Sequence, residues 1–121
     1  MDTADTAMRH WIAGAATGDW TALVALLDPS VAFHVPVSGF SGVQHGVESA
    51  ERFFAGLTAQ LRAALTVTAR LSGDDRTAFE VAVAGMLSGR AFEQRLCLVF
   101  VTADGKVREF REYLAFPSAA L

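Results

Sequence analysis

The segment V-R-E-F-R-E-Y-L-A-F, from Val107 to Phe116, has the composition of a β-strand but carries charged residues on both of its faces. Side chains alternate between the two faces of a strand. One face therefore holds Arg108, Phe110, Glu112 and Leu114, and the other holds Val107, Glu109, Arg111 and Tyr113. Aromatic residues among charges indicate that one face lines a pocket and the other meets a partner. The alternative is an edge strand that its charges protect from further pairing.

Three segments before this one alternate in the same way and end in turns. They cover residues 65–71, 77–88 and 92–101, and the turns are Gly73-Asp74-Asp75, Gly89-Arg90 and Asp104-Gly105. An Asp-Gly pair between two alternating segments is typical of a tight hairpin turn. The C-terminal half therefore predicts a sheet of long antiparallel strands.

The N-terminal half has the spacing of helices. Apolar residues recur at helical intervals over residues 6–17, over a segment from Asp19 to Asp28-Pro29, and over residues 47–63. A strand is expected at residues 31–37, and a glycine-containing loop follows it. Helices first and antiparallel strands afterwards predict an α+β fold. We expect one domain over residues 1–121, in which three helices pack on a strongly curved, mainly antiparallel sheet and leave a conical cavity.

Composition restricts the possible functions. The chain has 121 residues, of which 52% are hydrophobic and 19% charged, and its net charge is −3. It is too apolar for a disordered chain and lacks the basic cluster that nucleic-acid binding requires. One cysteine, Cys97, and three separated histidines do not have the spacing of a metal site. We expect no metal and no cofactor. The absence of a signal peptide and of a long apolar run predicts a cytoplasmic protein without a membrane partner.

The order of these features resembles one protein family. The chain reads W…G-D-W-x-A-L…L-x-P-x-V-x-F-H-V-P…G…H-G-x-E…F-F and then D-G-K-V-R-E-F-R-E-Y. This order resembles the SnoaL-like branch of the nuclear transport factor 2-like superfamily, which has a cystatin-like fold. Its members include ketosteroid isomerase, SnoaL-type polyketide cyclases and limonene-1,2-epoxide hydrolase. The resemblance covers nearly the whole chain, but a superfamily of isomerases, cyclases, hydrolases and non-enzymes does not fix the activity.

The resemblance to ketosteroid isomerase fails at the catalytic positions. The place of the general base holds Val35, and the places of the two oxyanion hydrogen-bond donors hold Trp11 and Cys97. No member of that set remains as an acid or base. Ketosteroid isomerase chemistry is therefore not expected.

The resemblance to the epoxide hydrolases and cyclases retains more of the site. The matching places of the hydrolase hold His34, Arg95, Cys97 and Glu112. Arg95 is kept, Glu112 is a homologous carboxylate and His34 is a polar group that can hold water, whereas Cys97 replaces an acid. SnoaL-type cyclases similarly use one acidic residue as acid and base on a neutral polyketide. The resemblance implies Glu112 as the acid/base group, with Arg95 and His34 assisting it.

Elementary chemistry supports the same three residues. Burial raises the pKa of a carboxyl group and a facing arginine lowers it, so Glu112 can exchange protons near neutral pH, where His34 also titrates. Counting back from the Asp104-Gly105 turn with no irregularity makes Arg95 a diagonal neighbour of Glu112. The alternatives are a structural cross-strand ion pair for Glu112 and Arg95, and a surface or rim position for His34.

The expected wall of the cavity is mostly apolar. We expect ligand contacts from Trp11, Val35, Phe53, Phe54, Glu80, Cys97, Phe110 and Leu114. The family register places Glu80 in the cavity, and the alternative is a charge at the mouth or in an interface. For Cys97 the alternative is a small buried hydrophobic residue.

Two functions remain open on this evidence. The first is a small cofactor-independent enzyme that acts by acid/base chemistry on an apolar organic molecule, as a cyclase, isomerase or hydrolase. The second is a non-catalytic small-molecule-binding or dimerisation module. In either case we expect a homodimer through the outer face of the sheet. The residues expected on that face are Val83, Leu96, Leu98, Phe100 and Tyr113.

Overall fold

The chain forms helices first and long strands afterwards. The computed structural model describes residues 2–115. Within them lie α1 (Thr3–Thr17), α2 (Thr21–Leu26), β1 (Leu27–His34), β2 (Gln44–His45), α3 (Val47–Gln60), β3 (Leu61–Ser72), β4 (Arg76–Leu87), β5 (Arg90–Ala103) and β6 (Lys106–Leu114). The elements match the expected order, with a two-residue strand, β2, inside the predicted loop.

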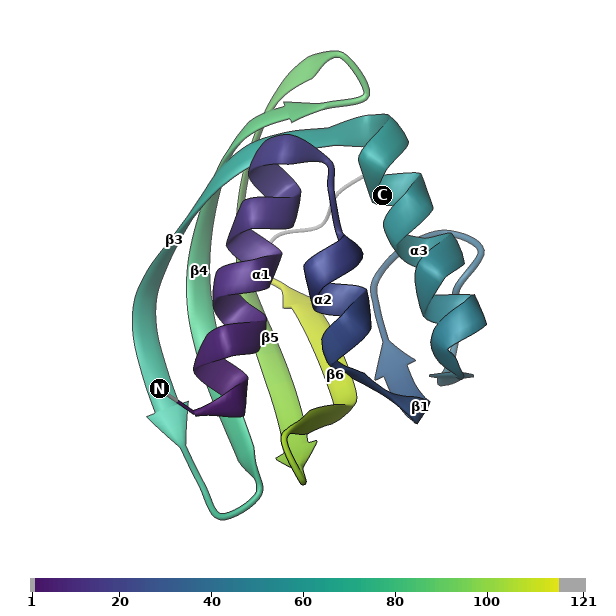
Figure 1. The fold of residues 1–121 in the computed structure, drawn as a ribbon. Helices are drawn as coiled ribbons and strands as arrows, with labels where there is room; N and C mark the ends of the chain where they lie inside the picture. Colours follow the sequence, from purple (N-terminus) through teal and green to yellow (C-terminus); the bar gives the residue numbers. More distant parts are fainter. Residues whose placement is uncertain (1, 116–121) are drawn as a thin grey trace.

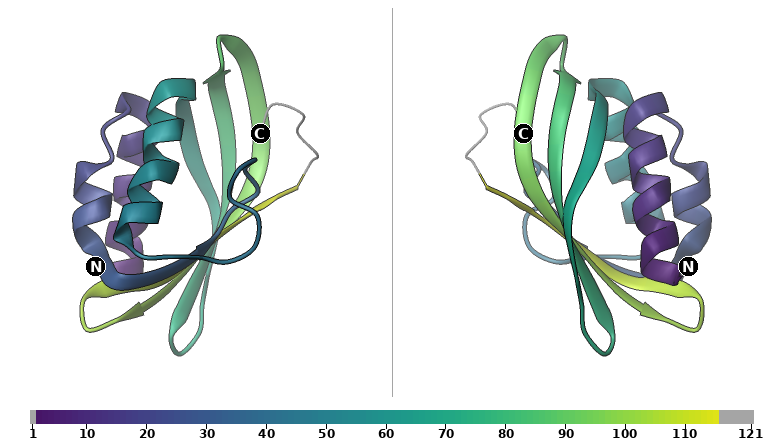
Figure 2. Two further views of the ribbon diagram at one scale, coloured as in Figure 1. Left: turned by 90° about the vertical axis from the view of Figure 1, so that its right-hand side faces the viewer. Right: turned by 90° about the vertical axis from the view of Figure 1, so that its left-hand side faces the viewer.

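The strands form one sheet in the spatial order β2-β1-β6-β5-β4-β3. β1 pairs with β6 in parallel, and the other neighbouring strands of the described residues pair antiparallel. Figure 1 and Figure 2 show the helices together on one face of the curved sheet, which we call the inner face. The opposite, outer face carries no helix among residues 2–115. The predicted α+β fold is confirmed.

An aromatic cluster fills the space between the helices and the inner face. Trp11 of α1 and Phe53 and Phe54 of α3 pack against Phe110 of β6. Phe33 of β1 stacks on Phe110 and contacts Phe53. All five side chains are at most 2% exposed. The helical spacing of apolar residues places these rings on one side of each helix, where they can meet the sheet.

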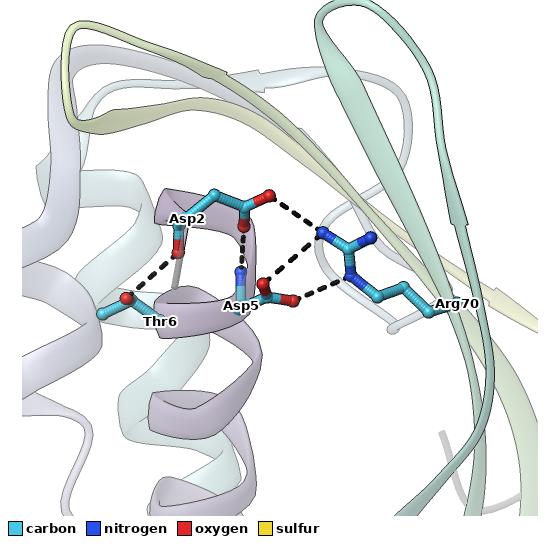
Figure 3. Close-up of polar contacts among 4 residues, drawn as sticks. All are labelled: Asp2, Asp5, Thr6 and Arg70. Atoms are coloured by element: carbon cyan, nitrogen blue, oxygen red, sulfur yellow. Dashed lines mark hydrogen bonds and ion pairs between the residues drawn. The ribbon is translucent and has the colours of Figure 1, made fainter.

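An ion-pair cluster fixes the start of α1 to β3 (Figure 3). Asp2 caps the helix, because its carboxylate accepts a hydrogen bond from the Asp5 backbone N–H at 2.9 Å. Arg70 of β3 donates to Asp2 and to Asp5, each at 2.8 Å. The Asp5 N–H and the charge of Arg70 lower the pKa of the Asp2 carboxyl group. These contacts hold in place the helix that carries Trp11.

Several element boundaries differ by a few residues from those expected, and two of them have a clear local cause. α2 ends at Leu26 rather than at Asp28-Pro29, because the chain is already extended at Leu27 (φ −76°, ψ 139°). The strand that follows also includes Pro29, which disfavours helical geometry in the residue before it. β3 begins at Leu61 rather than near residue 65, because Leu61 directly after α3 is already extended (φ −114°, ψ 130°).

The turn between β5 and β6 is the one that the sequence predicts. Asp104 and Gly105 have φ values of 55° and 73°, and Ala103 pairs with Lys106. Positive φ at both central residues is characteristic of a two-residue hairpin turn whose twist matches that of the strands. The pairing next to the turn is therefore as expected.

The register beyond the turn is not as expected, because β6 contains a β-bulge. Val107 pairs with Thr102, but the next paired residue of β6 is Glu109, which pairs with Val101. Arg108 is thus an extra residue on β6. A slip of one residue reverses which residues of two neighbouring strands share a face. From this point, every residue of β6 meets a different residue of β5 than an unbroken ladder would provide.

Candidate functional site

A partly open cavity lies between the helices and the inner face of the sheet. Its volume is about 40 Å³. Its wall consists of Trp11, Val37, Leu57, Leu61, Leu65, Val83, Leu87, Phe92, Gln94, Leu96, Glu112 and Leu114. Partly exposed residues such as Leu57, Phe92 and Leu114 form the rim, whereas Trp11 and Leu65 are buried. The cavity is almost entirely apolar, and Glu112 is the only titratable residue in this wall of described residues.

Glu112 has the surroundings of a carboxyl group that prefers its proton. It pairs with Leu98 on β5, so it points to the inner face with Phe110 and Leu114. Its side chain keeps some accessible surface because it forms cavity wall, although protein surrounds it. Desolvation by burial raises the pKa of Glu112 from 4.5 to about 7. Within residues 2–115, no hydrogen bond or ion pair reaches this carboxyl group to oppose that effect.

Gln94 is the other polar residue of the cavity wall, and it is not among the site residues predicted from the sequence. Its side chain is 5% exposed, and its Oε1 accepts a hydrogen bond from the backbone N–H of Arg95 at 2.9 Å. The sequence did contain a signal, because Gln94 lies at every-second-residue spacing with Leu96, Leu98 and Phe100 and therefore shares their face of β5. A polar residue in phase with an apolar face often marks a lined cavity.

The prediction that Arg95 faces Glu112 is wrong. Arg95 is exposed on the outer face, where its carbonyl accepts a hydrogen bond from the Ala115 N–H at 2.8 Å. The bulge at Arg108 is the cause, because it pairs Glu112 with Leu98 instead of Cys97. Residues Leu96 and Leu98 thereby share the inner face with Glu112, and Arg95 faces away from it.

His34 also lies outside the cavity. It is exposed, whereas its neighbours Phe33 and Val35 are buried, so it points to the outer side of β1. Its ring lies 6.1 Å from that of Tyr113, centroid to centroid. The rim or surface position left open by the sequence is therefore the observed one, and His34 does not hold a water against Glu112.

The expected ligand contacts separate into three groups. Trp11 and Leu114 line the cavity together with Glu112. Val35, Phe53, Phe54 and Phe110 are buried in the core and do not belong to the cavity wall. Glu80 and Cys97 lie on the outer face, so their expected place in the cavity is wrong.

The outer positions of Glu80 and Cys97 follow from the same register. The two residues pair across β4 and β5, and Cys97 pairs with Tyr113 on β6. They line a hollow of about 310 Å³ that also includes Arg95. Burial, with a smaller effect of the Glu80 charge, raises the pKa of the Cys97 thiol. A raised pKa lowers the thiolate fraction and disfavours a nucleophilic role.

Four of the five residues expected on the outer face lie on the opposite side. Val83, Leu96, Leu98 and Phe100 point to the inner face, where they belong to the core or to its margin. Tyr113 is on the outer face and is 43% exposed. Apolar residues on the helix-covered side are what the hydrophobic effect favours, and the bulge allows β5 and β6 to satisfy it together.

A family model confirms what this architecture suggests. The model of the SnoaL-like domain matches residues 8–110, which include most of the helices and strands. The chain belongs to the SnoaL-like domain family. No curated protein matches the sequence.

Solved structures of several other proteins resemble this SnoaL-like domain. An NTF2-like protein from Anabaena variabilis has a TM-score of 0.87 at 23% identity and covers 95% of this chain and 88% of its own. A protein from Jannaschia sp. CCS1, assigned as a SnoaL-like polyketide cyclase, has a TM-score of 0.75 at 19% identity. The match covers 93% of this chain and 85% of that protein. A protein of ketosteroid isomerase-like fold from Catenulispora acidiphila, in complex with trimethylamine, has a TM-score of 0.74 at 17% identity. The match covers 88% of this chain and 83% of that protein. At these identities the likeness shows the fold alone.

Among the described residues, the site of this SnoaL-like domain therefore contains one titratable group. No set of three His, Cys, Asp or Glu residues within 2–115 is arranged to hold a metal ion. In that same range, no helix has the length and apolar character needed to cross a membrane.

A carboxyl group near its pKa at neutral pH can act both as proton donor and as proton acceptor. The arrangement fits proton transfer within one bound molecule better than a reaction that needs a separate acid and base.

Proposed function

We propose that this SnoaL-like domain binds one small, mainly apolar organic molecule and that Glu112 transfers protons to and from it. The observation that supports this most is the isolated carboxyl group in an apolar cavity, with no cation among the described residues of its wall. A pKa near 7 gives comparable amounts of acid and base at neutral pH, which is the condition for efficient general acid/base catalysis. No cofactor is needed for such a step.

The reaction class that fits is an isomerisation or a cyclisation through an enol. One carboxylate removes a proton next to a carbonyl group, and the resulting carboxylic acid returns it to another atom of the same molecule. Epoxide opening is less well supported, because the residues that would share the work, Arg95 and His34, lie on the outer face. The family includes cyclases and isomerases, which agrees with this preference.

A non-catalytic binding module is the second candidate. The described cavity wall contains only one titratable residue, Glu112, and no other group there would assist the chemistry, which favours a binding module. The trimethylamine complex of the Catenulispora acidiphila protein supports the use of this fold to hold a small organic molecule. Both candidates share the cavity and differ in whether Glu112 moves a proton during turnover.

Proton exchange on a simple ketone distinguishes the two candidates. In deuterated water, the protein is expected to accelerate exchange of the carbon-bound protons of acetone or cyclobutanone, measured by NMR. Glu112→Gln should reduce this acceleration by about 100-fold or more, the usual size of a general acid/base contribution. The matched control Glu80→Gln changes an exposed carboxylate on the outer face and should leave the rate unchanged.

A cavity-blocking variant completes that test. Leu57→Trp adds bulk at the partly exposed rim and should abolish both exchange and ligand-induced chemical-shift changes. Exchange rates of Glu112→Gln within a factor of two of the parent, with ketone binding intact, would instead favour the binding module. No binding in the parent protein would contradict both candidates.

We also propose that the domain forms a homodimer through its outer sheet face. Leu71, Met86 and Tyr113 are exposed apolar residues there, at 61%, 45% and 43%. Sedimentation equilibrium at micromolar concentration should give a dimer, and Tyr113→Glu should shift it towards monomer while Tyr113→Phe does not. A parent protein that sediments as a monomer under these conditions would exclude this assembly.

A further inference from the structure

The charges around the cavity are unbalanced in one direction. Glu112 brings a carboxyl group, and no Arg, Lys or His of residues 2–115 contributes to the wall. Gln94, the other polar group, already uses its Oε1 to accept the Arg95 backbone N–H. An ionised Glu112 therefore has no counterion of its own in this apolar space. Such a charge is costly unless a bound molecule compensates it.

We propose that the cavity also binds a small tertiary amine, held as its ammonium ion by Glu112, so that the amine excludes the substrate while it is bound. This inference rests on the proposed function, because it takes the cavity as the ligand site. A cation replaces the missing counterion, and the pair forms where the effective dielectric constant is low. An anionic ligand would meet the like charge of Glu112 and finds no cationic side chain in the described wall.

The number of hydrogen-bond donors favours a tertiary over a primary amine. A primary ammonium ion has three N–H donors, as in lysine. The Glu112 carboxylate can accept two of them, and the third requires the remaining lone pair of Gln94 Oε1, which already accepts the Arg95 backbone N–H. A buried donor without a partner costs free energy. A tertiary ammonium ion has one N–H, which Glu112 satisfies, and its alkyl groups meet side chains such as Leu65, Val83 and Leu96.

The size of the cavity agrees with this class. Its volume is about 40 Å³, and on this measure one water needs roughly 10–15 Å³. A molecule of about four non-hydrogen atoms is therefore comparable to the space available. Larger amines require the rim at Leu57, Phe92 and Leu114 to open.

Binding couples to one proton on Glu112. The neutral acid gives its proton to the neutral amine: the O–H bond breaks, an N–H bond forms, and carboxylate and ammonium remain as an ion pair. The side chains that α1, α3, β3, β4 and β5 present to Glu112 across the cavity include no other titratable or charged group among the described residues. The affinity for the ammonium form should fall tenfold per pH unit below pH 7, where Glu112 is protonated. It should fall again above about pH 10, where alkylammonium ions lose their proton.

The test compares four molecules. Trimethylamine, isopropylamine and isopropanol have four non-hydrogen atoms each, and the slightly larger anion isobutyrate is the charge-reversed probe. NMR titration at pH 8 should give binding of trimethylamine at least tenfold tighter than that of isopropanol, weaker binding of isopropylamine, and none of isobutyrate. Glu112→Gln should reduce trimethylamine affinity at least tenfold and leave isopropanol within twofold. Glu80→Gln should change neither.

The outcomes separate this inference from the function on which it rests. Isopropanol binding as tightly as trimethylamine, or trimethylamine affinity that survives Glu112→Gln, would overturn the amine while leaving the cavity as a ligand site. Isopropylamine binding more tightly than trimethylamine would overturn the preference for a tertiary amine. Absence of binding by all four molecules, together with no effect of Leu57→Trp on any titration, would overturn both the inference and the proposed site.

Discussion

Glu112→Gln is expected to raise the free energy of unfolding by about 1 kcal/mol or less at pH 5 and by about 3 kcal/mol at pH 9. Burial moves the pKa of this carboxyl group from 4.5 to about 7 in the folded protein, and each pKa unit corresponds to about 1.36 kcal/mol. Glutamine has nearly the shape of the protonated acid and carries no charge. The substitution therefore removes a cost that the parent protein bears at every pH where Glu112 is ionised in the unfolded chain, that is, above about pH 4.5.

The sign of the effect follows from proton binding. Between pH 4.5 and about 7, the folded protein keeps a proton on Glu112 that the unfolded chain has released. Stability rises with pH only where the unfolded state binds more protons, so the Glu112 contribution falls across this range and stays at its lowest value above it. This is opposite to the usual behaviour of an ion-paired carboxylate, whose pKa is lowered.

Urea unfolding of both proteins at pH 5, 7 and 9 measures this difference. Every other titratable group of the chain is common to both proteins, so its contribution cancels in the comparison. Glu80→Gln, on the exposed outer face, should stay within about 0.5 kcal/mol of the parent at every pH. A pH-independent difference between Glu112→Gln and the parent would contradict the buried, unpartnered carboxyl group.

Phe110→Ala is expected to lower the free energy of unfolding by about 3–5 kcal/mol, the usual range for removing a buried aromatic ring. Phe110 is 1% exposed and stacks on Phe33 with ring centroids 4.9 Å apart. Trp11 and Phe54 contact it from the helices at 5.6 and 5.7 Å. Alanine would leave a cavity where the helices, β1 and β6 meet, and these elements cannot all close onto it.

Tyr113→Ala is the matched control for Phe110→Ala, because it removes an aromatic ring from the same strand on the exposed outer face. Tyr113 is 43% exposed, so its loss should cost about 1 kcal/mol or less in the monomer. Chemical denaturation of both variants at low protein concentration measures the two effects. Equal losses would mean that the faces of β6 are not those that the bulge at Arg108 produces.

The helices and the hairpin turns follow from local sequence patterns. The spacing of Trp11, Phe53 and Phe54 places three rings on the buried faces of two helices, and Asp104-Gly105 adopts the expected turn. These features depend on residues close together in the chain. Some observed helix and strand ends differ by a few residues from the predicted ones, because the strand begins earlier than the local pattern indicates, as at Leu61.

The face on which Glu112 lies is encoded locally, whereas the residues that accompany it are not. Phe110, Glu112 and Leu114 share one face as the sequence predicts. Arg108, which the alternation groups with them, is exposed instead, and Val107, which it places on the other face, is buried in the core. The partners of Glu112 on β5 depend on the register between two strands, which one extra residue reverses. The need to bury Leu96 and Leu98 on the same side as Phe110 favours the shifted register over the unbroken one.

The sequence by itself thus determined the α+β architecture, the helix-to-strand order and the inward position of Glu112. Only the tertiary structure decided that Arg95, Cys97 and His34 lie outside the cavity, which leaves Glu112 as its single titratable group among the described residues. The physical reason is the β-bulge at Arg108: an insertion of one residue in a ladder changes no local propensity, yet it exchanges the inner and outer faces of the strand that pairs with it.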